Sequence, residues 1–573
     1  MKTSFSLHYT MKNSISLLLL GTLLLTASCK KDFLQRDPGV PISEEDVFKD
    51  PVLAARFADN SYNFLLDDYG RLEATHKGTT GQFTDEAIFS GGNGAVTPMN
   101  QGNFDNPNAS DVAGVYTRMY QGIRNVNVMI SKIDSVPWTD VQSPGLIKAQ
   151  MHFLRGFFYF ELVKRYGGVI LLDKAIPLSE NKNTDLPRST FEETVTFILD
   201  DLRIAEGLFA TDSLANVYTP RGDWNAAGHY GRPTVGAVKA LRSRLLLLVA
   251  SPLHNPNGDP AKWKNAANAA KEIMDMGKYS LHTPYATLLT QATSPEYIMI
   301  KVRPNRNSTG GMLGDFVIPP SWGGGQGQLN PTQNHVDLYE TSKGKFITDP
   351  TSGYNPQDPY KDRDPRLTNN VLYNDVTWQN RKMEMWTVPN SAATGLDYKP
   401  TSVTYTRTRY YCRKLWPPVY RPGSTNTSLL NFVFFRYGET LLNYAEALNE
   451  AEGPTSQVYE AIRLIRVRAG MQALPANLSK DQMRERIHNE RAVELAFEEH
   501  RWWDLLRWKK GQSVVAQPVY AMNVFKVGNT FIYNPELLPA SYQRVFTDRM
   551  YLYPIPRLEI QRSTGILEQN PGW

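Results

Sequence analysis

The sequence predicts a mainly α-helical fold: a tetratricopeptide-like scaffold of helix pairs, with long irregular aromatic-rich loops and little β-structure. Over most of the chain, apolar residues recur at intervals of three and four, which is typical of amphipathic helices. Between about 291 and 430 this period is lost, and Gly, Pro, Asn and Asp are interspersed with tryptophan and tyrosine. Structureless stretches of that length are uncommon in compact domains and are often functional, so we expect long surface loops there.

The N-terminus has the features of a lipoprotein signal peptide. Basic residues precede a short apolar run that ends in Ala27 and Ser28, and this run is too short to span a bilayer. Cys29 follows directly, and it is one of two cysteines among 573 residues. We therefore expect residues 1–28 to be removed and Cys29 to carry lipid that anchors the chain to a membrane. Ordinary secretion with a free thiol is the alternative, and Met11 is a second candidate start.

From Cys29 onward, the sequence predicts a tether followed by one compact body. Residues 29–48 are polar and contain two prolines and a glycine, which suits a connection between lipid and fold. The body then comprises an N-terminal helical region, 49–290, and a C-terminal region, 291–573, with a loop insertion at about 291–430. The large size of the body allows an extensive hydrophobic core.

Composition narrows the classes of partner. The net charge of +5 is spread thinly and no run of five or six basic residues occurs, so we do not expect nucleic acid to bind. Aromatic residues make up 11% of the chain, which favours a surface that binds by stacking. Beyond Cys29 only Cys412 remains, so the sequence predicts neither an intramolecular disulfide nor a cysteine-ligated metal. We expect no cofactor and no metal site.

The expected helices follow from the apolar period. The 145–166 segment is apolar nearly all round, so its helix must lie between other helices. Turn residues separate the next two helices as in a helix-turn-helix pair, although the chain lacks a clean 34-residue repeat. The expected helices span 115–130, 145–166, 191–205, 235–250, 261–276, 437–452, 456–469 and 480–510.

Charged residues share the apolar face of the last expected helix. On a helical wheel, Glu490, Glu494 and Arg501 fall on the same stripe as its apolar side chains. A buried carboxylate without a partner is costly, so we expect a structural ion-pair network here. The alternative is a catalytic pair of carboxylates. The expected partners are arginines of the preceding helix, Arg463, Arg466 and Arg468.

Residues 489–505, which begin Asn489-Glu490-Arg491 and end Trp503-Asp504-Leu505, resemble the C-terminal signature of the SusD/RagB family of outer-membrane nutrient-binding lipoproteins. The other matching motifs occur in the family's order, and the similarity covers essentially the mature chain. These motifs are 155–168, Asp364-Pro365-Arg366, 444–450, 465–470, 553–556 and 569–572.

The resemblance implies a helical scaffold topped by irregular loops that carry the ligand site. It also implies a location on the outer membrane facing the cell exterior, and a SusC-like TonB-dependent transporter as partner. The function implied is non-enzymatic binding of an oligosaccharide or polysaccharide. A RagB-type peptide receptor is one alternative. A surface glycoside hydrolase is another, and it would need two carboxylates about 5–9.5 Å apart in an aromatic cleft.

Two stretches have the composition of a sugar-binding site, because sugars need aromatic planes beside polar side chains. The first runs from 84 to 104, and the second, 319–327, places Trp322 beside several glycines where it could stand clear of the surface. Packing in the core is the alternative for every aromatic candidate. The candidate ligand-binding residues are Trp322, Phe89, Asn93, Asn103, Phe104, Trp378, Trp386 and Tyr285.

Overall fold

The computed structural model describes residues 43–66, 69, 78–91, 96–106, 109–139, 144–176, 186–211, 231–302, 316–421, 428–563 and 565–573. The expected signal peptide, Cys29 and most of the expected tether lie outside these residues. The first described helix, α2 (Glu44–Lys49), already begins within the 29–48 range. Ser43 caps this helix by accepting a hydrogen bond from Asp46 N, and the Asp46 carboxylate accepts one from Ser43 N.

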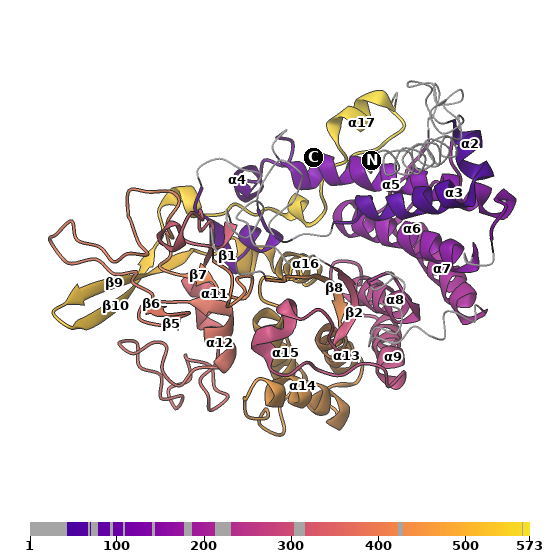
Figure 1. Cartoon of the computed structure of the whole chain (residues 1–573). Coiled ribbons are helices and arrows are strands. Elements are labelled where there is room, and N and C mark those ends of the chain that lie inside the picture. Colours follow the sequence, from indigo (N-terminus) through magenta and orange to yellow (C-terminus); the bar gives the residue numbers. More distant parts are fainter. Residues whose placement is uncertain are drawn as a thin grey trace, which may run out of the picture.

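Helices of the N-terminal half form one side of the molecule (Figure 1). The predicted all-round burial of the 145–166 segment is confirmed, because α6 packs between α5 and α7 and buries most of its side chains. The next two helices, α8 and α9, pack on each other as expected. The elements are α3 (Pro51–Asn60), α4 (Val96–Asn100), α5 (Ser110–Lys132), α6 (Pro144–Tyr166), α7 (Phe191–Thr211), α8 (Val235–Ala250) and α9 (Pro260–Asp275).

Helices of the C-terminal half dock on this scaffold. The central one, α13, packs against α8 and α9 on one side and against α14 and α15 on the other, so it joins the two halves. A second apolar core, centred on residues such as Trp263, Leu441 and Ile487, fills the space between them. The elements are α13 (Tyr437–Glu452), α14 (Ser456–Arg468), α15 (Lys480–Glu494), α16 (Arg501–Arg507) and α17 (Arg557–Arg562).

The expected single helix over 480–510 is wrong, because the chain breaks it between α15 and α16. Phe497 (φ 61°) and Glu499 (φ 64°) adopt the left-handed conformation, which ends the right-handed helix. Both are non-glycine residues, for which this conformation is uncommon. The break lies inside the motif that resembles the family signature.

In the part of the chain that the structure describes, strands are short and occur only as pairs, so the predicted fold class, mainly helical with little β-structure, is confirmed. All five pairs are antiparallel. They are β1 (Ala87–Phe89) with β3 (Leu329–Pro331), β2 (Tyr297–Lys301) with β8 (Phe432–Arg436), β4 (Val371–Leu372) with β7 (Tyr411–Cys412), β5 (Thr377–Trp378) with β6 (Arg381–Lys382), and β9 (Tyr520–Val527) with β10 (Thr530–Leu537).

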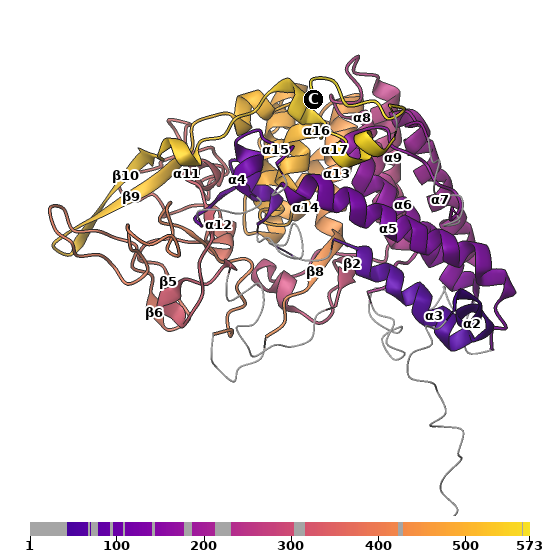
Figure 2. The same ribbon diagram turned by 90° about the horizontal axis from the view of Figure 1, so that it is seen from above.

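We call residues 316–421 and 511–546, together with β1, the loop lobe. It lies at the end of the molecule opposite α7, and the β9–β10 hairpin projects from it in both views (Figures 1 and 2). Its short helices are α11 (Gln333–Asp337) and α12 (Pro365–Asn370). The lobe has its own small core of aromatic and aliphatic side chains, which explains how such an irregular segment keeps a defined shape. That core contains Ile318, Trp322, Leu372, Trp378, Met383, Met385, Tyr398, Tyr411, Trp416 and Tyr420.

Within the described part of the chain, every helix is too short or too polar to cross a membrane.

Candidate functional site

The two stretches selected from the sequence lie side by side. Strands β1 and β3 pair antiparallel, with Phe89 opposite Leu329 and Ile88 opposite Asn330. Just beyond the pair, Ser90 N donates to the Gln328 carbonyl at 3.3 Å. The early loop and the segment that contains Trp322 therefore meet, although more than 200 residues separate them in the chain.

A small polar and aromatic surface is formed where these strands end, and we call it the β1–β3 site: Phe89, Ser90, Gly91, Gln326 and Gln328. The Phe89 ring is half-buried, and Gln328 Nε2 donates to Gln326 Oε1 at 2.8 Å. A Cβ added at Gly91 would lie 2.7 Å from the Phe89 ring and 2.9 Å from Gln328 Nε2. A larger residue at this position would therefore displace the Phe89 ring or the Gln328 amide.

The β1–β3 site has unused hydrogen-bonding capacity. Ser90 Oγ and Gln328 Oε1 are buried and have no partner among the described residues. Most buried polar atoms in proteins are paired, so two neighbouring orphans indicate a place that a ligand or water can complete. The buried side chain of Gln82 joins the two segments, because its Nε2 donates to the carbonyls of Ile88 and Gln328, both at 3.0 Å.

The expectation that Trp322 stands clear of the surface is wrong. Its side chain is only 9% exposed and packs edge-on against Trp416, with the ring centroids 5.3 Å apart. The indole Nε1 donates to Asp397 at 3.1 Å, and Arg381 stacks over the ring. The left-handed Gly323 (φ 103°) follows Trp322, so the chain reverses there. The flexible glycines turn the tryptophan into the lobe's core.

Three more aromatic candidates are buried. Trp378 packs on Trp416, and Tyr285 lies beside the C-terminal signature with its hydroxyl donating to the Glu494 carbonyl at 3.1 Å. Phe104 packs between Tyr553 and the C-terminal tryptophan. These side chains fill the interior and offer no open plane to a ligand, so packing is the reading that the geometry supports.

The remaining candidates are dispersed. Trp386 is half-buried beside β9, where Lys526 Nζ lies 4.4 Å from its ring centroid. Asn103 is exposed after α4, and Asn93 lies outside the described residues. Of the seven predicted residues that the structure describes, Phe89 alone lies in the β1–β3 site. The sequence analysis missed Ser90, Gln326 and Gln328, although all three lie within or next to the two selected stretches.

The ion-pair network around Glu494 is present and larger than expected. Glu494 is fully buried and contacts Arg436 at 2.8 Å, Arg366 at 3.1 Å and Arg468 at 2.5 Å. Burial alone would raise the pKa of Glu494, but the three guanidinium groups outweigh it and hold that pKa well below its usual range. The carboxylate is therefore charged and fixed, as a structural group is.

Other members of the network differ from the expected pairing. Glu490 contacts Arg466 at 2.9 Å and also Arg366. Arg463 instead forms an exposed pair with Glu460, and Arg501 binds Asp85 at 2.8 Å. The sequence analysis missed Arg366 and Arg436 as partners. Arg366 belongs to the Asp364-Pro365-Arg366 motif, which could have identified it as a partner of the network.

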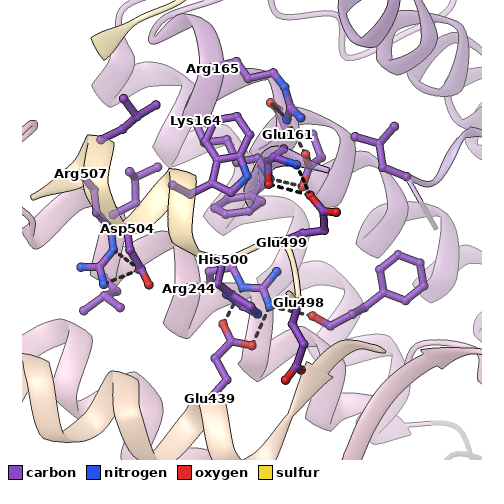
Figure 3. A pocket seen from close by; sticks show the side chains of 18 of the residues that line it. Glu161, Lys164, Arg165, Arg244, Glu439, Glu498, Glu499, His500, Asp504 and Arg507 are labelled. Carbon is purple, nitrogen blue, oxygen red and sulfur yellow. Dashed lines mark hydrogen bonds and ion pairs between the residues drawn. The ribbon is translucent and has the colours of Figure 1, made fainter. Parts of the chain in front are cut away.

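A cavity of about 130 Å³ lies between α6, α8, α16 and β8 (Figure 3). Several of its acidic side chains contact basic neighbours: Glu439 contacts Arg244 at 2.6 Å, and Asp504 contacts Arg507 at 2.8 Å. The Glu161 carboxylate likewise contacts Lys164 at 2.7 Å. Glu499, which also lines the cavity, accepts from Thr80 N at 2.8 Å.

Burial and ion pairing set the protonation states in this cavity. Burial lowers the pKa of Lys164 to about 8 and that of His500 to about 4, so the imidazole is neutral at pH 7. Burial would raise the pKa of Glu498, but Arg436 and Lys414 outweigh it and lower that pKa to about 2. A carboxyl group with such a low pKa is a poor proton donor at neutral pH.

Among the described residues, no group of three or more His, Cys, Asp or Glu side chains could hold a metal ion. Asp364 caps α12 by accepting from Arg366 N, and its carboxylate pairs with the Arg366 side chain.

A helical scaffold that carries an irregular lobe with a polar and aromatic surface defines a binding protein of the SusD type. The family model described as the SusD family matches residues 287–573, half of the chain. A second model, described as starch-binding and associating with the outer membrane, matches residues 59–233. The chain belongs to the SusD/RagB family.

Relatives and solved structures agree with this assignment. The chain is 25% identical to SusD-like protein P38 of Formosa agariphila over 521 residues, which cover 88% of this chain and 92% of the relative. A SusD-like protein of Bacteroides fragilis superposes with a TM-score of 0.74 at 24% identity, covering 93% and 99% of the two chains. Surface glycan-binding protein A of Bacteroides fluxus superposes with a TM-score of 0.61 at 20% identity, covering 93% and 100%.

Proposed function

We propose that this protein is a non-enzymatic surface lipoprotein that binds an oligosaccharide or polysaccharide at the β1–β3 site. The observation that carries the proposal is the site itself: a half-buried Phe89 ring next to two buried polar atoms, Ser90 Oγ and Gln328 Oε1, that have no described partner. Sugars present apolar C–H faces and a rim of hydroxyls, which match an aromatic plane beside hydrogen-bonding groups.

Names of related proteins support the same class of ligand. The model that matches residues 59–233 is described as starch-binding, and a B. fragilis neighbour with a TM-score of 0.71 is titled a SusD-like carbohydrate-binding protein. We further propose that Cys29 is acylated and holds the protein on the outer membrane, facing the exterior. Its ligand would pass to a SusC-like TonB-dependent transporter, as membership of the family suggests.

A binding role is favoured over hydrolysis by the state of the carboxylates. Glu161, Glu439 and Asp504 of the cavity are paired with arginine or lysine, and ion pairing lowers the pKa of Glu498 to about 2. Glu86 is different, because burial raises its pKa to about 8. However, it is only 2% exposed and its Oε2 accepts from Phe497 N at 3.0 Å. This acid is therefore held inside the fold.

The proposal is tested by affinity electrophoresis of the full-length protein, in mild detergent, through gels that contain a panel of polysaccharides. We expect at least one polysaccharide to retard the protein, and Phe89→Ala to abolish the retardation. Phe531→Ala is the matched control, since Phe531 is a half-buried phenylalanine on β10. Release of reducing ends during incubation would favour the hydrolase, and peptide binding without any glycan retardation would favour the RagB-type receptor.

A further inference from the structure

Several buried arginines of the loop lobe have no carboxylate partner among the described residues, unlike those of the scaffold, although Arg366 of the lobe is an exception that contacts three carboxylates. Each buried scaffold arginine contacts a carboxylate within 4 Å. These are Arg155, Arg165, Arg436, Arg466, Arg491, Arg501 and Arg507. The buried arginines without a carboxylate contact among the described residues are Arg363, Arg409 and Arg544, and all three lie in the loop lobe.

We propose that the glycan bound at the β1–β3 site is anionic, with carboxylate or sulfate groups held by Arg407 and Arg421. This inference rests on the proposed function, and it adds the class of ligand. Guanidinium groups match both oxyanions well, because their planar fork can donate two parallel hydrogen bonds.

Arg407 lies next to the paired strands. Its backbone N donates to Asn330 Oδ1 at 2.9 Å, and Asn330 is opposite Ile88, the neighbour of Phe89. The side chain is half-buried, and Nη1 donates to the Pro400 carbonyl at 2.6 Å. Its Nε is buried without a partner in the described part of the chain. Arg407 therefore has a cationic head whose described contacts include no carboxylate.

Arg421 lies beside the side chain of Trp322, which precedes Gln326 of the β1–β3 site by four residues. Its guanidinium carbon is 5.7 Å from the centre of the Trp322 ring, and it is half-buried. Its described side-chain hydrogen bonds go to neutral amides, including Asn380 Oδ1 at 2.6 Å. Arg381, on the same ring, instead holds Asp397 through both nitrogens at 2.7 Å. Arg421 is thus the cation of this pair that contacts no carboxylate among the described residues.

Deeper groups add to the positive field at the site. Arg544 donates to the Ala87 carbonyl of β1 at 2.7 Å, and burial lowers its pKa to about 10, which still leaves it charged at pH 7. Glu86, also next to β1, is protonated at neutral pH because burial raises its pKa to about 8. Asp85 is neutralised by Arg501, while Glu499, which also lies near Glu86, accepts from Thr80 N. Unbalanced charge in a low-dielectric wall attracts counter-ions, so an anionic ligand would be favoured.

The test compares charged glycans with their neutral forms, using the full-length protein in mild detergent. The probes are polygalacturonate and its carboxyl-reduced form, and κ-carrageenan and its desulfated form. We expect one anionic polymer, or both, to retard the protein in affinity electrophoresis and its neutral counterpart to do so at least about tenfold less. Which polymer binds distinguishes carboxylate from sulfate recognition. Higher salt should weaken the binding.

Variants separate a built site from attraction by net charge. Arg407→Gln and Arg421→Gln should each weaken binding of the anionic polymer at least about tenfold. Arg463→Gln removes the same charge from an exposed pair on α14 and should leave binding unchanged. Equal binding of neutral and anionic forms, or equal loss in all three variants, would overturn the inference while leaving glycan binding intact. If no polysaccharide in the wider panel binds, the proposed function itself fails.

Discussion

Replacing Glu494 by glutamine tests whether the buried network is structural. Gln preserves the shape of the side chain but removes the charge that faces Arg366, Arg436 and Arg468. Removing one partner of a buried ion pair typically costs about 3–5 kcal/mol. Each of these arginines keeps another carboxylate, such as Glu296, so we expect the lower end, about 3 kcal/mol.

This loss of unfolding free energy can be converted into a change in the melting temperature. With an unfolding entropy of about 2.1 cal/mol/K per residue, 573 residues give about 1.2 kcal/mol/K, so the midpoint should fall by about 2–3 °C. The folded-state pKa of Glu494 lies below the ordinary value of 4.5. The stabilisation is therefore present above about pH 4.5 and is lost as the pH falls below it, which makes pH 7 the right condition.

Differential scanning calorimetry and urea denaturation at pH 7 would measure the effect. Glu460→Gln is the control, since Glu460 forms an exposed pair with Arg463 and its loss should leave the midpoint unchanged within about 1 °C. If Glu494→Gln melts at the same temperature as the wild type but is no longer retarded by glycan, the network is functional and our assignment of it as structural is refuted.

Three further predictions concern single side chains. Glu86 binds its proton more tightly in the folded state, so the free energy of unfolding of the wild type should fall as the pH rises from about 4.5 to 8. Glu86→Gln should remove this dependence, which amounts to up to about 1.4 kcal/mol per pH unit. If urea denaturation shows the same pH dependence for the variant and the wild type, the prediction is contradicted. A Cβ at Gly168 would lie 2.0 Å from the Ser189 carbonyl oxygen, so Gly168→Ala should lower the free energy of unfolding in urea by about 2 kcal/mol or more. The control is Gly207→Ala, which should not destabilise the protein because no atom lies within 4 Å of the added Cβ. Trp322→Ala should cost about 3–5 kcal/mol in urea denaturation by emptying the lobe's core; unchanged stability with lost glycan retention would restore Trp322 as a stacking platform.

Much of the helical scaffold was predictable because its helices bury one face or all faces. The apolar period predicted a helix over 235–250, and α8 spans Val235–Ala250. The break between α15 and α16 was not predictable in this way. Phe497 and Glu499 adopt left-handed backbone angles without a glycine or proline to signal the turn, and the apolar stripe continues through the break. Long-range contacts over-determine the local conformation there.

The site was predictable as two stretches of chain, but the residues within them were mostly not. Local composition indicated aromatic and amide side chains near Phe89 and Trp322, and β1–β3 pairing joins the two stretches. Composition cannot tell an exposed aromatic ring from one that fills a small core. In a lobe with few long helices, tryptophans supply the buried area that holds the loops together, so Trp322 and Trp378 are used for packing.

The broken segment of the family signature explains how the scaffold positions the β1–β3 site. Phe497 N donates to Glu86 Oε2 at 3.0 Å, and Arg501 holds Asp85 at 2.8 Å. Glu499 Oε2 accepts from Thr80 N at 2.8 Å. All three contacts reach the chain at or just before β1, and all three depend on the turn that a continuous helix would remove. The left-handed residues therefore orient the signature toward the strand that carries Phe89, which links the family's most recognisable motif to the placement of the site.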